Sequence, residues 1–415
     1  VATLLGISGR DLRNVLALLV LISAISCTFF INELKNIYGV LAAALSLAII
    51  FMFYRKISGT LLTEHIGISF GLLGFSLLLR GGDKLLKKDV LAGLFFITLG
   101  MMARPGTLFT LPLCVIWIVW VFRKKKGISW WMGLFSLAMI VSGIFINSFI
   151  FGLTTDTKSR QFSNFSFTFY GISNGGNDWS TFYSDHPEAY NLNEPELSKT
   201  AYHYAFQEIK EKPSNFFIGI IKGWKEFFGT PDGVFSFMSI KNQGWGEMRD
   251  TPIIPISPFN IIRTTIFALS ILGITGLLFY KNKNISSLII LMIVGILLSV
   301  PFIPPRDAGF RVYAVSIPII ALIPSAGLCY IIAKLNLGHI LNRTSFTFEI
   351  SGLPFGIILT LLIVVGPILI TVFPDPTRYS DFSCVDFKEE GSVRLDKGSF
   401  VAILPDGDIN KTWLP

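Results

Sequence analysis

The chain contains 415 residues, of which 52% are hydrophobic and only 15% are charged. A soluble domain of this size carries more charge, so the composition excludes an ordinary soluble globular protein. The formal net charge is +8, but the lysines and arginines are dispersed over short connectors. That distribution is typical of membrane topology and not of a nucleic-acid-binding face. The four cysteines are too scattered for a metal motif or a disulfide framework.

Ten hydrophobic stretches could cross a hydrocarbon core of about 30 Å as helices, some of them only with tilt or local thinning of the bilayer. In chain order they cover residues 14–32, 37–54, 60–79, 88–104, 106–122, 130–152, 261–280, 286–303, 312–333 and 353–373. We therefore predict an all-α polytopic membrane protein with about ten transmembrane helices.

Four of the connectors between these stretches are basic. Their basic residues are Arg80, Lys84, Lys87 and Lys88; Arg123, Lys124, Lys125 and Lys126; Lys281 and Lys283; and Lys334, His339 and Arg343. An alternating path through ten spans places all four connectors on one side, which the positive-inside rule assigns to the cytoplasm. Arg55 and Lys56 fall on the outer side, where a pair at a helix end can extend to the interface. The protein is expected in the plasma (inner) membrane.

The same features divide the chain into four parts. These are an N-terminal transmembrane block (1–152), an extracytoplasmic segment (153–260), a C-terminal transmembrane block (261–373) and an extracytoplasmic tail (374–415). The chain begins at Val1 and ends in a polar run, so we expect a fragment at both ends, with an incomplete tail.

The extracytoplasmic segment is expected to be mostly helical. Residues 194–212 predict a helix that Pro213 stops, and Ser214 can then cap a second helix over 215–228. Aromatic residues alternate with lysines along the second helix. This pattern fits a helix lying in the lipid headgroup layer, and it fits equally well an amphipathic helix packed on the extracytoplasmic domain.

Glu64 and His65 lie at the predicted outer start of the third span. An ionisable group at this depth costs several kcal/mol unless it is paired or hydrated, which makes Glu64 a candidate functional residue. The alternative is an acid placed favourably on the helix dipole. Thr63 precedes it and could already cap the helix.

Arg104 opens a tight turn, Arg104-Pro105-Gly106, between two short spans. The short spans place this turn below the ends of the neighbouring helices, where a guanidinium requires an anion. Arginine binds phosphate through a planar fork and stays charged. An interfacial arginine that contacts lipid phosphate is the alternative.

The loop over residues 304–311 carries Arg306, Asp307 and Arg311. Two prolines stiffen its start, and Gly309 permits a sharp turn. One net positive charge on the outer side makes this loop the strongest candidate anion site, with a structural ion pair as the alternative.

The two histidines of the outer segment, His186 and His203, have acidic neighbours but no zinc-binding spacing. Histidines in such positions are more often surface residues or hydrogen-bonded structural residues. The Gly175-Gly176 pair predicts a turn.

An ordered set of short motifs resembles a known family. The residues are Gly39; Thr63-Glu64; Gly93, Ala103-Arg104-Pro105-Gly106 and Leu111-Pro112; Tyr170-Gly171, Gly176-Asn177-Asp178-Trp179 and His186-Pro187-Glu188; Ile209, Pro213, Phe216, Lys222 and Trp224; and Asp307, Arg311 and Pro318. Together, over most of residues 1–373, they resemble the membrane-embedded GT-C glycosyltransferases. The most similar group contains the protein O-mannosyltransferases and the aminoarabinose transferase of lipid A.

The resemblance implies an enzyme that moves a sugar from a polyprenyl-phosphate donor to a lipid, glycan or protein acceptor outside the cytoplasm. Arg104, Arg306 and Arg311 would bind the donor phosphate, with His65 and Asp307 in support. Glu64 would act in catalysis or orient a divalent metal, whose requirement is unknown. The family's best-known catalytic acid follows its first span and has no match in this sequence.

Three other functions are compatible with the pattern. An O-antigen polymerase or ligase also has many spans and one large outer loop with arginines. A polyprenyl-lipid transporter would also use outward charges, but should carry broken helices near mid-membrane. A non-catalytic scaffold is the third alternative.

Overall fold

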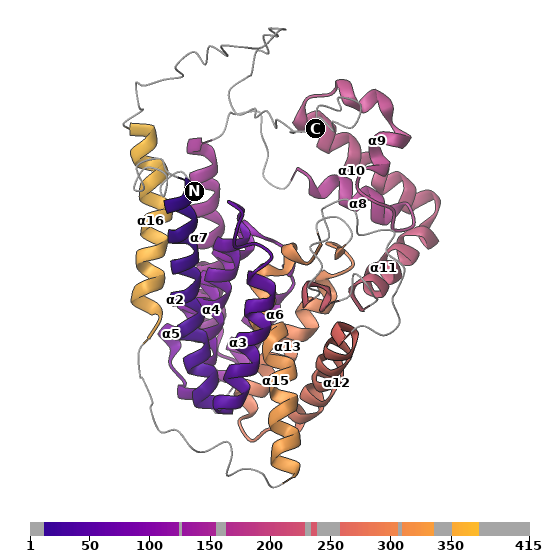
Figure 1. Cartoon of the computed structure of the whole chain (residues 1–415). Helices are drawn as coiled ribbons and strands as arrows, with labels where there is room; N and C mark the ends of the chain where they lie inside the picture. Colours follow the sequence, from indigo (N-terminus) through magenta and orange to yellow (C-terminus); the bar gives the residue numbers. More distant parts are fainter. Residues whose placement is uncertain are drawn as a thin grey trace, which may run out of the picture.

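The computed structural model describes residues 12–123, 127–154, 163–228, 234–238, 258–305, 309–335 and 351–372. Of these described residues, 84% are helical and none lies in a strand, which confirms the all-α prediction for this part of the chain. Figure 1 shows a bundle of long helices with a smaller group of short helices at one end.

The ten helices of the bundle coincide with the ten predicted stretches. They are α2 (Leu12–Tyr38), α3 (Val40–Tyr54), α4 (Glu64–Lys84), α5 (Lys87–Ala103), α6 (Thr110–Val121), α7 (Trp130–Thr154), α12 (Pro258–Phe279), α13 (Lys283–Ser299), α15 (Ile317–Lys334) and α16 (Leu353–Val372). A 3-10 helix, η4 (Gly309–Ser316), leads directly into α15.

Five segments are long and apolar enough to cross a membrane by length and composition. They are Leu12–Tyr38, Glu64–Lys84, Trp130–Leu153, Ile261–Phe279 and Gly309–Lys334. Other apolar helices are shorter: α6, with 12 residues, extends only about 18 Å at the usual helical rise. The structure therefore has the helical, apolar character of a membrane protein, while the count of ten spans stays a prediction.

Helix α4 forms the centre of the bundle, with 89% of its most apolar window buried. Glycines allow its neighbours to approach closely. A Cβ atom at Gly71 would collide with the carbonyl oxygen of Val315 in η4, and one at Gly74 would lie 2.8 Å from the carbonyl oxygen of Gly93 in α5. Helices α4 and α5 and the 3-10 helix η4 are thereby packed against one another.

The helices that follow α7 in the chain form a second packed unit, which we call the unit of short helices because three of them have nine residues or fewer. They are α8 (Phe165–Ser173), α9 (Thr181–Asp185), η1 (Pro187–Asn191), α10 (Glu194–Glu211) and α11 (Pro213–Phe228). A further 3-10 turn, η2, covers Ser236–Met238. Their small core contains Phe167, Tyr170, Phe182, Ala201 and Ala205.

Helix α10 agrees with the predicted helix over 194–212, but the predicted start of the next helix was wrong. Pro213 opens α11 instead of only ending α10, and Ser214 lies in its first turn instead of capping it. Proline is favoured at the first helical position, because that position needs no N–H and already has the fixed φ of proline.

Helix α11 attaches the short helices to the bundle. The Trp224 indole donates a hydrogen bond to the carbonyl oxygen of Leu297 in α13 (2.7 Å), and the Phe227 ring packs on Tyr313 of η4 with centroids 5.5 Å apart. On another face, Phe217 and Ile221 are 63% and 62% exposed. The helix thus packs on its neighbours through one face and leaves an apolar face uncovered by described residues.

Candidate functional site

Three of the charged residues singled out in the sequence meet at one point. Glu64, the first residue of α4, is fully buried. Its Oε1 atom accepts a hydrogen bond from Nη2 of Arg104 (2.8 Å) and lies 3.3 Å from Nη1 of Arg311. We call Arg104, Glu64 and Arg311 the charged triad.

The turn after α5 positions Arg104. The helix ends at Ala103, and Arg104 itself is extended, with φ −148° and ψ 94°, which is the conformation that a following proline favours. The Gly106 amide then donates to the carbonyl oxygen of Val312 (3.2 Å). A Cβ atom at Gly106 would collide with that oxygen, so only glycine permits this close approach.

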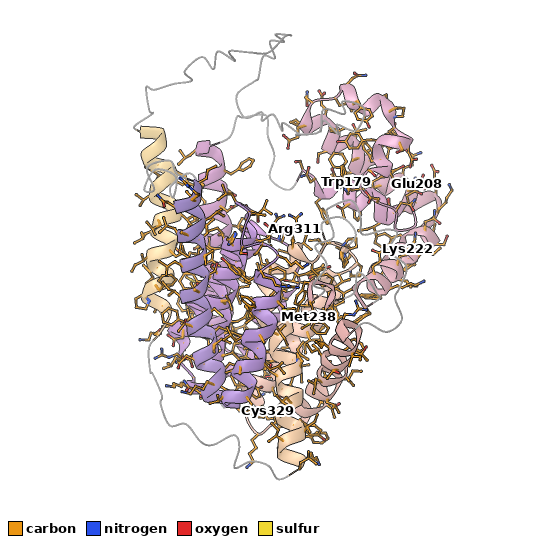
Figure 2. All side chains as sticks on the ribbon, viewed as in Figure 1. Trp179, Glu208, Lys222, Met238, Arg311 and Cys329 are labelled. Carbon is orange, nitrogen blue, oxygen red and sulfur yellow. The ribbon has the colours of Figure 1, made fainter. Side chains whose placement is uncertain are left out.

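The 3-10 helix η4 positions Arg311. A hydrogen bond between the hydroxyls of Thr107 and Ser316 ties η4 to the turn that carries Arg104, and Gly309 adopts a positive φ of 63°. A positive φ is the conformational freedom for which the sequence singled out Gly309. Figure 2 shows Arg311 at the end of the bundle nearest the short helices.

The triad carries one net positive charge. Glu64 has no exposed surface, whereas the side chains of Arg104 and Arg311 are each 22% exposed. The carboxylate thus lies beneath two guanidinium groups that reach the surface. Oε2 of Glu64 is buried and has no hydrogen-bond partner among the described residues. Two fixed, partly exposed guanidinium groups suit the binding of an oxyanion.

Thr63 does not cap α4 as the sequence suggested. It occupies the N-cap position, but its side chain makes no capping hydrogen bond in the part of the chain that is described. Its backbone is in the helical region, with φ −67° and ψ −12°, whereas capping side chains usually accompany an extended N-cap.

Both ring nitrogens of His65 form hydrogen bonds with nearby residues of the same segment. Nε2 lies 2.9 Å from the carbonyl oxygen of Thr60 and 3.0 Å from that of Ile57, so Nε2 carries a proton and donates. Nδ1 then accepts from the Tyr54 hydroxyl (2.9 Å). These bonds fix the segment that leads into Glu64, so His65 supports the site indirectly.

Arg306 and Asp307 lie outside the described residues, as do Lys124, Lys125 and Lys126 of the basic connector and all of the predicted tail. Among the described residues, no group of three or more His, Cys, Asp or Glu side chains is arranged to hold a metal.

The unit of short helices contains a cavity of about 300 Å³, which we did not predict from the sequence. Its lining includes Tyr170 from α8 and Asn174 directly after it, Asp185 at the end of α9 and His186 directly after it, and Tyr204 and Glu208 from α10. His186 had been expected to be a surface or structural histidine, and its ring stacks on Tyr204 with centroids 3.8 Å apart. The only local signal was the pair of acidic neighbours around His186.

No family model, no curated protein and no solved structure matches the chain.

Proposed function

We propose that this protein is a membrane-embedded glycosyltransferase that moves a sugar from a polyprenyl-phosphate donor to a lipid, glycan or protein acceptor on the extracytoplasmic face. One observation carries the proposal. Arg104 and Arg311, which are far apart in sequence, converge on the same buried carboxylate oxygen and remain partly exposed. A site for an anion at the end of an apolar bundle suits a ligand that joins a phosphate to a hydrocarbon tail.

The chemistry needs positive charge at this place. When the bond between the sugar C1 and the phosphate oxygen breaks, both bonding electrons stay with the phosphate. The acceptor hydroxyl forms the new bond to C1, and its proton goes to a base. Negative charge therefore grows on the phosphate in the transition state, where fixed guanidinium groups stabilise it. The hydrocarbon tail would lie between the helices.

Glu64 acts in this proposal through the arginines. Its Oε1 atom already contacts both guanidinium groups, so the carboxylate holds them at a fixed separation. Its second oxygen, buried and without a described partner, is the atom through which Glu64 could also accept a proton or contact a metal.

The test begins with polyprenyl phosphate, the product common to all donors of this class. We expect the purified chain to bind polyprenyl phosphate and not the uncharged polyprenol. Arg311→Ala should weaken binding about tenfold to a hundredfold, because a hydrogen bond to a charged group contributes about 1.5–3 kcal/mol. Arg311→Lys should recover part of the loss, since it restores the charge without the planar fork.

The control is Lys199→Ala, which removes an exposed positive charge from α10 and should leave binding unchanged. Equal binding of polyprenol and polyprenyl phosphate, or unchanged binding by folded Arg311→Ala, would refute the assignment of the triad.

A second assay measures turnover. Proteoliposomes with a labelled polyprenyl-phosphate sugar should release polyprenyl phosphate and form a glycosylated acceptor. An O-antigen polymerase or ligase would instead require an oligosaccharide on a polyprenyl diphosphate, and a transporter would move the lipid without forming a product.

A further inference from the structure

Acidic and aromatic side chains line the cavity in the unit of short helices. Two carboxylates, Asp185 and Glu208, lie among the rings of Tyr170, Tyr204 and His186, and no lysine or arginine is present among the described residues that line it. The lining is therefore negatively charged and aromatic. Figure 2 shows Glu208 in the unit of short helices and Arg311 in the bundle, so the cavity is separate from the charged triad.

Asp185 is already held in place by neutral donors. Its Oδ2 atom accepts hydrogen bonds from the Tyr170 hydroxyl (2.9 Å) and from the Asn174 amide (3.1 Å). The pKa of Tyr170 is raised above its usual value, first by burial and then by this bond to Asp185, and the charge of Glu208 acts in the same direction. The hydroxyl thus stays protonated and remains a hydrogen-bond donor to Asp185.

Glu208 lacks such a donor. Its Oε2 atom is buried and has no hydrogen-bond partner among the described residues. A buried carboxylate oxygen without a hydrogen-bond donor costs more free energy than an unpaired neutral polar atom. A ligand that brings a donor to Oε2 of Glu208 would therefore be stabilised. Gln207 does not supply that donor, because its amide donates to Glu211 (2.8 Å).

The lining discriminates among ligand classes. Phosphates and carboxylates are excluded by like charge. A neutral sugar could supply hydroxyl donors, but it would leave both negative charges uncompensated. An ammonium group supplies up to three charge-assisted donors and is attracted to the faces of tyrosine rings.

We propose that this cavity binds a small ligand through a primary ammonium group, which donates to Glu208 and lies between the carboxylates and the tyrosine rings. The group could belong to an amino sugar or to an ethanolamine head group, because both present the same cation. The proposal is independent of sugar transfer at the charged triad.

The experiment titrates the purified full chain with two matched ligands, glucosamine and N-acetylglucosamine. Acetylation removes the charge and keeps the sugar ring, so we expect glucosamine to bind and N-acetylglucosamine not to bind. A parallel titration with ethanolamine, which carries the ammonium group of that head group without its phosphate, identifies the source: the amine with the lower Kd is the class that the cavity selects. If neither amine binds, or if both sugars bind equally well, the proposal is wrong.

Variants locate the binding. Glu208→Gln keeps the shape of the side chain and should raise the Kd for glucosamine about tenfold or more, the loss expected for one charge-assisted hydrogen bond. Glu196→Gln is the matched control, because it makes the same change at an exposed position of the same helix and should leave the Kd unchanged. An unaltered Kd in folded Glu208→Gln would overturn the assignment.

Discussion

Replacing Glu64 with glutamine tests whether this acid only complements the helix dipole or holds Arg104 and Arg311 in position. An acid that only complements the helix dipole contributes about 0.3–1 kcal/mol. In the structure, however, Glu64 is fully buried and contacts two guanidinium groups at 2.8 and 3.3 Å. Removing one partner from a buried ion pair costs about 3–5 kcal/mol.

The expected cost lies between these values. Arg104 and Arg311 each remain 22% exposed, so water can partly solvate them after the carboxylate is lost, and the glutamine oxygen still accepts one hydrogen bond. We therefore expect Glu64→Gln to lower the free energy of unfolding by about 2 kcal/mol. Glu64→Ala should lower it more, because it also leaves a cavity.

The assay has three measurements on the same sample: the thermal unfolding midpoint in detergent, polyprenyl phosphate binding, and sugar transfer. Both arginines keep their charge in Glu64→Gln, so binding should be retained. Product formation should be lost, because the two guanidinium groups repel each other and no longer share a fixed position.

The control is Glu196→Gln, an exposed glutamate of α10, which should change none of the three measurements. A Glu64→Gln protein with a normal unfolding midpoint and full activity would refute the reasoning. It would return Glu64 to the role of a helix-dipole acid.

The remaining predictions concern the parts that hold the site and its orientation in the membrane. Gly106→Ala should lower the rate of sugar transfer while the protein still folds, since the added Cβ displaces η4 and with it Arg311. Gly59→Ala is the control, because a Cβ there meets no atom, and it should change neither the transfer rate nor the unfolding midpoint. Trp224→Phe should loosen α11 at a cost of about 1 kcal/mol, because it removes one hydrogen bond and keeps an aromatic ring at this place. The expected readout is faster proteolysis near α11 with wild-type proteolysis of α4. A cysteine introduced at Ser180 should react with an impermeant reagent in intact cells and one at Lys125 should not, and the opposite labelling would reverse the predicted topology.

Hydrophobic length alone located the helices. Each of the ten predicted stretches coincides with a helix, because a run of apolar residues that must satisfy its own backbone hydrogen bonds away from water has few alternatives to a helix. The ends of the helices were less predictable. Pro213 can either stop one helix or open the next, and the structure shows that it opens α11.

The charges were recognisable one by one, because an ionisable residue at the end of an apolar stretch is conspicuous in any sequence. The sequence therefore determined which residues deserved a functional explanation, among them Glu64, Arg104 and Arg311. It did not determine that they touch. Their convergence depends on close packing of α4, α5 and η4 at small residues. Glu64 and Arg104 are 40 positions apart, η4 comes from the other helical block, and no local pattern encodes such contacts. The sequence did not predict the cavity around Glu208 either, because its carboxylates and rings come from α8, the end of α9 and α10, which only the tertiary structure brings together.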